Sequence, residues 1–264
     1  MSARSLAGLR ARRTFECRLE PERALRSLEA AAEFLDDRGI LTRTADSALP
    51  SLFGACHQPP FRPGRGGFAD WPATAYPWFW ELARRDGVHE LSVHNGKRVL
   101  VTHATAALAD DICRAGLAAA EAGGGDPAEL LGHLASAGPS PLDDLKVELE
   151  WDAARLRRAR RPLERTGALV SHGVTLAAEQ GGHIHSSVLA RWDQAFPEPS
   201  SGSLADVIVV CVRAAVLAPQ AELLRWFSWG PQPDDAMIDG LVADGRLQRP
   251  AEGWIAAPSM SDSR

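Results

Sequence analysis

The sequence of 264 residues lacks the long apolar run of a membrane protein. Its most apolar stretch, LADVIVVCVRAAVLAP, is interrupted by Arg213 and falls short of the roughly 20 apolar residues that a membrane span needs. The N-terminal stretch MSARSLAGLRARRTF has basic residues but no apolar segment or cleavage site, so we expect no secretory signal peptide. These absences predict a cytoplasmic protein without a membrane partner.

Several motifs of metal, cofactor and hydrolase chemistry are also missing. The four cysteines are scattered, which argues against a disulfide framework and against a cysteine-rich zinc site. There is no His-Glu-x-x-His, no Gly-x-Ser-x-Gly and no Gly-x-x-x-x-Gly-Lys phosphate loop. We therefore expect no metal and no small-molecule cofactor.

The overall composition is that of an ordinary globular chain, with 45% hydrophobic and 24% charged residues. The length suffices for one large domain or for two to three small ones. The net charge is −5. A mildly acidic chain of this kind binds nucleic acid only through a local basic face.

A Leu-x-x-x-Gly-x-Leu pattern occurs three times, at Leu35–Leu41, Leu163–Leu169 and Leu241–Leu247. In each copy we expect the first leucine to face the core on the last turn of a helix. The glycine would end that helix in the left-handed conformation, and the second leucine would begin a strand. Many connections between helices and strands have this form, but three copies favour a repeated unit with irregular spacing.

The C-terminal region reads as three helices followed by a β-hairpin. Helical segments are predicted for SLADVIVVCVRAAVLA, PQAELLRWFSWG and QPDDAMIDGLVADG, with Asp234 or Asp235 as the cap of the third. The hairpin has PAEG as its turn and Trp254 on the returning strand. Three helices and a two-stranded wing are the plan of the winged helix, a variant of the helix-turn-helix.

The middle of the chain follows the same plan. Asp126 is predicted to cap its first helix and Asp152 its third, before two strands joined at EQGG. The N-terminal region has one long helix in EPERALRSLEAAAEFLDDRG and a hairpin at Asn95-Gly96. We therefore predict an α+β, mainly helical fold of tandem winged-helix units with β-hairpin wings. The predicted units span residues 1–121 (a modified unit), 126–197 and 203–258.

The segments RPLERTGALVSHG, HIHSSVLARWDQAF and ELLRWFSW followed by MIDGLVADGRL carry a likeness to a known family. With them, the chain resembles the tandem winged-helix superfamily that contains the AlkZ-type alkylpurine and crosslink-repair DNA glycosylases. The likeness covers roughly the C-terminal half, with a weaker match in FADWPATAYPWFWELARR. The Gln-x-Gln catalytic motif of those glycosylases is absent, and CHQPPF keeps one Gln. The resemblance implies a DNA-associated fold and leaves the reaction open.

The third helix of the middle unit, AARLRRARRPLERTG, is the strongest candidate for contact with DNA. A helical period places its apolar residues on one side and most of its arginines on the other, as a helix lying in a groove requires. Alternatively, these arginines form a solvated face that is partly paired with nearby carboxylates, and Pro162 could kink the helix. The DNA-binding residues predicted here are Arg155, Arg157, Arg158, Arg161 and Arg165.

A second basic element, FRPGRGG, carries Arg62 and Arg65 beside a segment rich in aromatic residues. The two arginines could grip a phosphate backbone, while Trp71 and Trp78 could stack on an exposed base. The alternative is that these aromatic side chains belong to the core. For a glycosylase reaction, Asp70 is the first carboxylate to consider as the base that activates water.

Three histidines are predicted on the wing of the middle unit. His183 and His185 alternate along one strand, and His172 lies on its partner. We interpret them as wing contacts with phosphates. An open zinc site is the less favoured alternative, because no further ligand stands at a recognisable spacing.

Three hypotheses follow for the function. The first is a winged-helix protein that binds double-stranded DNA, in repair or in protection from alkylation. The second is a DNA glycosylase that hydrolyses the N-glycosidic bond of alkylated bases without the Gln motif. The third is a protein-interaction or regulatory module, which predicts that the arginine face is buried or paired. The sequence leaves open whether the protein is an enzyme and what its oligomeric state is.

Overall fold

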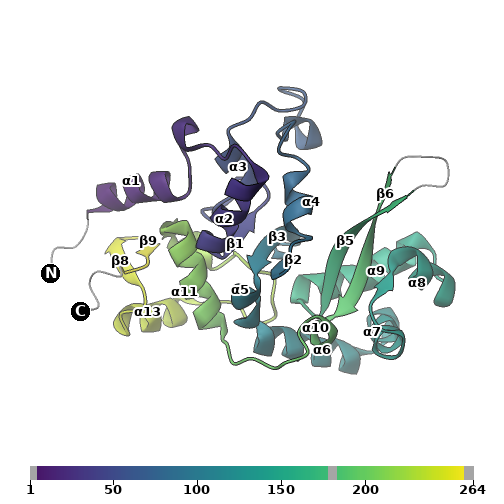
Figure 1. Ribbon diagram of the computed structural model, residues 1–264. Helices are drawn as coiled ribbons and strands as arrows, with labels where there is room; N and C mark the ends of the chain where they lie inside the picture. Colours follow the sequence, from purple (N-terminus) through teal and green to yellow (C-terminus); the bar gives the residue numbers. More distant parts are fainter. Residues whose placement is uncertain (1–4, 178–182, 259–264) are drawn as a thin grey trace.

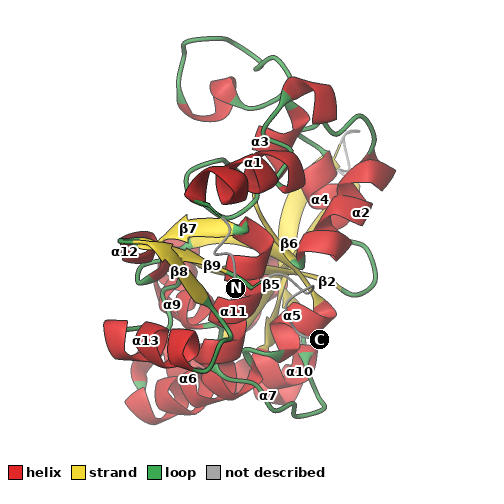
Figure 2. Cartoon of the chain, turned by 90° about the vertical axis from the view of Figure 1, so that its left-hand side faces the viewer, coloured by secondary structure: helices red, strands yellow, loops and turns green. Residues whose placement is uncertain are grey.

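The computed structural model describes residues 5–177 and 183–258. It is an α+β fold in which helices surround three separate antiparallel sheets of three strands each (Figure 1). Figure 2 shows the strands crossing the middle of the molecule, with helices above and below them. The expectation of an α+β, mainly helical chain is confirmed. In residues 5–177 and 183–258, every helix is too short or too polar to cross a bilayer.

In the first region, a capped helix precedes the first strand of the sheet, and short helices lie between the first strand and the second. The elements of this region are α1 (Leu6–Glu16), η1 (Pro21–Arg23), α2 (Leu28–Arg38), β1 (Ile40–Thr42), α3 (Leu52–Cys56), η2 (Gly67–Asp70), α4 (Trp78–Leu82), β2 (Val88–His94) and β3 (Lys97–Thr102). The single long helix predicted here is wrong, because Ser27 caps a new helix by accepting a hydrogen bond from the amide of Ala30. The hairpin turn at Asn95-Gly96 is confirmed, with φ of 53° and 74°.

The middle region consists of α5 (His103–Ala107), α6 (Asp110–Gly123), α7 (Gly125–Ala137), β4 (Ser140–Pro141), α8 (Leu142–Glu148), α9 (Ala153–Thr166), β5 (Leu169–Ala177), β6 (His183–Arg191) and α10 (Trp192–Ala195). Asp152 caps α9 as predicted. Asp126 does not cap α7, because the helix begins at Gly125, two residues before the predicted start, and the carboxylate of Asp126 binds Arg155 instead. The predicted EQGG turn lies outside the described residues.

The C-terminal region consists of α11 (Leu204–Ala215), β7 (Leu217–Pro219), α12 (Gln220–Leu223), α13 (Asp235–Ala243), β8 (Gln248–Ala251) and β9 (Trp254–Ala256). Asp234 caps α13 by accepting a hydrogen bond from the amide of Met237. Ala251 pairs with Trp254 across a tight turn, so the predicted hairpin is confirmed.

The three sheets share one topology. The chain segment that forms each sheet runs through a helix, a strand, two helices and two further strands in that order. The first segment has the additional short helix η2. The strand orders are β1-β3-β2, β4-β6-β5 and β7-β9-β8. In every case the last strand therefore lies between the other two. The same supersecondary unit occurs three times within the described chain.

The three copies of the leucine-glycine pattern do not all occupy the same place in their units, in contrast to the prediction. Gly39, Gly167 and Gly245 all have positive φ, at 75°, 77° and 69°. Gly167 and Gly245 follow the third helix of their units, but Gly39 follows the first helix of its unit. The pattern therefore records a local way of ending a helix, and only two of its copies occupy equivalent places in the repeat.

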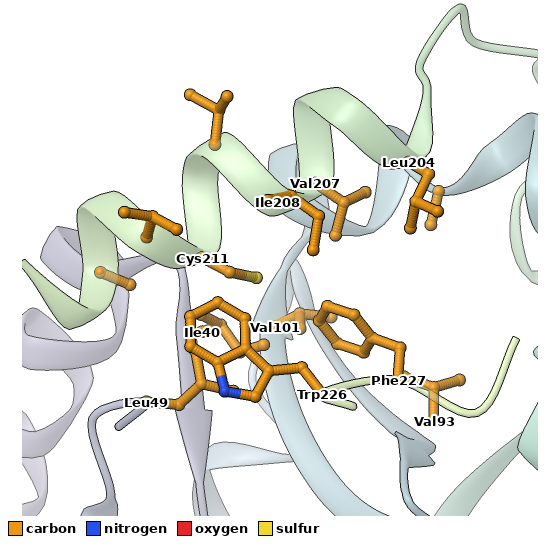
Figure 3. Packing of buried hydrophobic residues seen from close by; sticks show 14 of the residues in the cluster. Ile40, Leu49, Val93, Val101, Leu204, Val207, Ile208, Cys211, Trp226 and Phe227 are labelled. Atoms are coloured by element: carbon orange, nitrogen blue, oxygen red, sulfur yellow. The ribbon is translucent and has the colours of Figure 1, made fainter. Parts of the chain in front are cut away.

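The largest hydrophobic core joins the first sheet to the C-terminal unit. Figure 3 shows Ile208 and Cys211 of α11 above Val101 of the first sheet, with Trp226 and Phe227 packed beside them. The middle unit has its own core, to which α9 contributes its apolar side chains. A third core lies under α2, α3 and α4. The first and last thirds of the chain are thus packed together, although the middle unit separates them in sequence.

Candidate nucleic-acid interface

Helix α9 is fixed at both ends and along one face. The carboxylate of Asp152 accepts a hydrogen bond of 2.6 Å from the amide of Arg155, and Gly167 ends the helix in the left-handed conformation. Leu156 and Leu163 are 3% and 2% exposed and pack in the core of the middle unit. The helix continues through Pro162, so this residue does not divide it. The burial pattern leaves the opposite face of α9 toward solvent.

That opposite face is basic. Four arginines of α9 are exposed: Arg157, Arg158, Arg161 and Arg165. Within residues 5–177 and 183–258, none of their guanidinium groups takes part in an ion pair. An unpaired guanidinium on a rigid helix is available for charge-assisted hydrogen bonds with an anionic partner.

The other two arginines of the helix are engaged within the protein. Arg155 Nη2 lies 2.8 Å from a carboxylate oxygen of Asp126 and 3.2 Å from one of Glu129. Its guanidinium also covers the ring of Trp151 at 4.3 Å. Arg160 faces Glu164 at 3.8 Å. Arg155, which the sequence placed among the DNA-binding residues, therefore ties α9 to α7.

The equivalent third helices of the other two units have a different character. Helix α13 has 9 residues with Asp235 and Asp239 and no Lys or Arg. Helix α4 has 5 residues, of which Glu81 is the charged one. Helix α9 has 14 residues and carries six arginines. Among the three equivalent positions, α9 is the helix whose charge suits a polyanion.

Behind α9, the buried carboxylate of Glu90 and the half-buried carboxylate of Glu164 lie near the first sheet. Arg98 Nη1 is 2.5 Å from Glu90 Oε1, and Glu90 is 2% exposed. Burial raises the pKa of Glu90 to about 7, although the positive charges of Arg98 and Arg43 act to lower it. Burial also raises the pKa of Glu164 above its usual range, although Arg160 and Arg98 lower it. Glu90 lies on β2 and Glu164 on α9, so both groups belong to the packing between these two elements.

The C-terminal end of α9 meets both other units. The hydroxyl of Ser228 lies 2.8 Å from the carbonyl of Arg165 and 3.0 Å from the carbonyl of Val93. The amide of Ser228 donates to the same Val93 carbonyl at 2.8 Å. Asn95 in the hairpin turn donates to the carbonyl of Arg225 at 2.7 Å. Residues from three distant parts of the sequence therefore fix the position of the end of the helix.

The second basic element lies on a separate loop. Arg62 and Arg65 are exposed there, and so is Asp70 at the end of η2. An exposed carboxylate lacks the enclosed pocket that reaction on an extruded base requires. The structure gives no support for Asp70 as a catalytic base.

Aromatic side chains cover the same loop in two layers. Trp71 and Trp78 are half-buried against the core, and Trp71 stacks on Tyr76 with ring centroids 5.8 Å apart. Phe61 and Phe68 stack on each other at 5.1 Å and are 40% and 52% exposed. The outermost rings are thus the two phenylalanines, which sequence reasoning missed. Their places on either side of RPGRGG were the available signal.

The predicted wing histidines are not gathered at one point along the hairpin. His172 pairs with Val188, whereas His183 and His185 pair with Ala177 and Thr175. The side chains of His183 and His185 lie outside the described residues. Burial lowers the pKa of His172. The parts of the chain that the structure describes contain no cluster of three or more His, Cys, Asp or Glu side chains able to hold a metal ion.

Comparisons of the chain with protein-family models, with curated proteins and with solved structures find no match.

Proposed function

We propose that the protein binds double-stranded DNA through tandem winged-helix units, with α9 as the helix that enters the groove. The support is the repeated order of helix, strand, two helices and two strands, with the last strand central in each sheet. That order fits the winged-helix variant of the helix-turn-helix, and in helix-turn-helix proteins a recognition helix contacts the major groove. In the middle unit the third helix is α9.

The observation that carries the proposal is the unpaired arginine face of α9. A protein gains DNA affinity by neutralising phosphates and releasing their counterions, and this requires cations that are not already paired. Arg157, Arg158, Arg161 and Arg165 meet that requirement within the described chain. The protein-interaction hypothesis predicted a buried or paired face, which is not the arrangement of these four side chains.

The test is the reversal of charge at Arg158 and Arg161 in the full-length protein. Fluorescence anisotropy with a plain duplex should show a loss of affinity of at least about 60-fold at 0.1 M salt, because two phosphate contacts are removed. The matched control is Arg213→Glu, which reverses an exposed arginine on α11. Equal affinities of R158E/R161E and R213E would overturn the proposal.

A place in DNA repair is a further part of the proposal, and the exposed pair Phe61 and Phe68 favours it. Flat aromatic rings on the surface offer stacking partners to an unpaired base. A duplex with one abasic-site analogue should then bind more tightly than the plain duplex, and a Phe61→Ala, Phe68→Ala double variant should lose that preference. Equal affinity for both duplexes would exclude the repair role and would be consistent with general DNA binding alone.

A further inference from the structure

A cavity of about 550 Å³ lies at the place where the three units meet. The first unit contributes His94, Asn95 and Lys97 from its hairpin, and α9 contributes Arg165. The C-terminal unit contributes a segment around Arg225. Arg165 and Ser228 also line a second hollow with Arg158 and Arg161, so the cavity is continuous with the basic face of α9.

The charges around this cavity leave a small positive excess. Lys97, Arg165 and Arg225 are exposed cations, and Asp46 and Glu222 are the two carboxylates. Lys97 pairs with Asp46, so that cation is already compensated. Glu222 accepts a hydrogen bond of 2.8 Å from the indole of Trp226. Arg165 and Arg225 remain without an ion pair among the residues that the structure describes.

His94 at the wall of the cavity adds no cation at neutral pH. Burial lowers its pKa, although the carbonyl of Trp226 and the charge of Asp46 act in the opposite direction. The ring nitrogen Nδ1 lies 2.7 Å from that carbonyl, and Nε2 lies 3.9 Å from Asp46. The cavity therefore carries a net charge close to that of one free cation.

Both unpaired arginines are positioned by contacts within the protein, Arg165 along its aliphatic stem and Arg225 through Nε. A Cβ placed on Gly96 would lie 3.7 Å from Cγ and Cδ of Arg165, so this side chain runs along the hairpin turn. Arg225 donates through Nε to the carbonyl of Ala221 at 3.1 Å, which leaves its two terminal nitrogens without a partner in the described chain. Two guanidinium groups from different units are thus placed at the rim of one cavity.

We propose that this cavity binds one phosphodiester group of the DNA backbone, with Arg165 and Arg225 as its ligands. A phosphodiester carries a single negative charge, which matches the net charge of the site better than a dianionic phosphate does. The inference rests on the proposed function and extends it, because it gives the C-terminal unit and the first hairpin a direct place in DNA binding. Arg165 lies seven residues beyond Arg158, about 10 Å along the helix axis. The phosphate in the cavity is therefore a different one from the phosphate that Arg158 contacts.

The experiment compares Arg225→Ala with Arg213→Ala in the full-length protein. Both arginines are exposed and belong to the C-terminal unit, but Arg213 does not line the cavity. Anisotropy with a plain 20-base-pair duplex across a salt series should show R225A losing about 0.9 from the slope of log K against log salt. Its affinity at 0.1 M salt should fall about eightfold, while R213A stays at the wild-type value.

The outcomes separate this inference from the proposed function. If R158E/R161E loses affinity and slope but R225A matches R213A, the cavity proposal is overturned and α9 remains the DNA-binding helix. If wild-type protein binds no duplex at low salt, both proposals fail. If inorganic phosphate raises the melting temperature of wild type but not of R225A, and duplex binding is unchanged, the site takes a free anion and the proposal is overturned.

Discussion

Glu90 offers the sharpest test of the packing between the first sheet and α9. Its carboxylate is 2% exposed and lies beside Arg98, with Glu164 of α9 nearby. Burial raises its pKa from the ordinary value of 4.5 to about 7. Between these two pH values the native state binds more protons at this site than the unfolded state does. The contribution of Glu90 to the free energy of unfolding should therefore be largest below pH 4.5 and should be lost as the pH rises through 7.

The size of the effect follows from the shift. A change of one pKa unit corresponds to about 1.4 kcal/mol, so Glu90 should remove about 3 kcal/mol of stability between pH 4.5 and pH 8. Glu90→Gln keeps the shape and removes the titration. The free energy of unfolding of E90Q minus that of wild type should therefore increase by about 3 kcal/mol from pH 4.5 to pH 8.

The assay is urea unfolding followed by tryptophan fluorescence at intervals from pH 4.5 to pH 8. Subtracting the wild-type curve from the E90Q curve removes the titration of distant groups and leaves that of Glu90 with the groups coupled to it, such as Glu164. Glu198→Gln, which removes a carboxylate at an exposed position, is the matched control for the substitution itself. A flat difference for E90Q would refute the account of Glu90 as a carboxyl whose charge is disfavoured by burial.

Three further predictions concern the packing of the same fold. Leu163→Ala should lower the free energy of unfolding by about 2–5 kcal/mol in urea, because its side chain is 2% exposed in the middle core. Pro162→Ala should raise the helix stability by about 1–3 kcal/mol in the same assay, since it restores an amide that can bond to the Arg158 carbonyl. The four buried cysteines should react with a thiol reagent only after unfolding, because burial raises the pKa of Cys17 to about 11 and of Cys56 to about 12. Rapid reaction of the cysteines in native buffer would contradict their burial. A free energy of unfolding that L163A or P162A leaves unchanged would contradict the packing of α9.

The features of α9 that could be predicted from sequence are local ones. The cap at Asp152, the glycine that ends the helix and the alternation of leucine and arginine depend on residues within one or two turns of each other. The same is true of the hairpin turn at Asn95-Gly96 and of the cap at Asp234. Where the deciding contacts lie nearby in the chain, periodicity and capping preferences are sufficient.

The features that sequence reasoning missed depend on distant partners. Asp126 has a side chain suited to capping, but Arg155 binds it across 29 positions of sequence. The helical pattern also predicts Arg155 as a DNA contact, because that pattern gives no sign of its carboxylate partners on α7. The cavity beside Arg225 joins segments separated by more than a hundred residues, so no spacing in the chain could indicate it.

The proposal that α9 binds DNA is tested most directly by the salt dependence of duplex binding by the full-length protein. Arg157, Arg158 and Arg161 contribute three phosphate contacts, and the phosphodiester shared by Arg165 and Arg225 is a fourth. At about −0.9 for each contact, they predict a slope of log K against log salt of about −3.6. Measurable affinity at 50 mM salt that falls with this slope would support the proposal. Absence of binding at 50 mM salt, or a slope near zero, would contradict it.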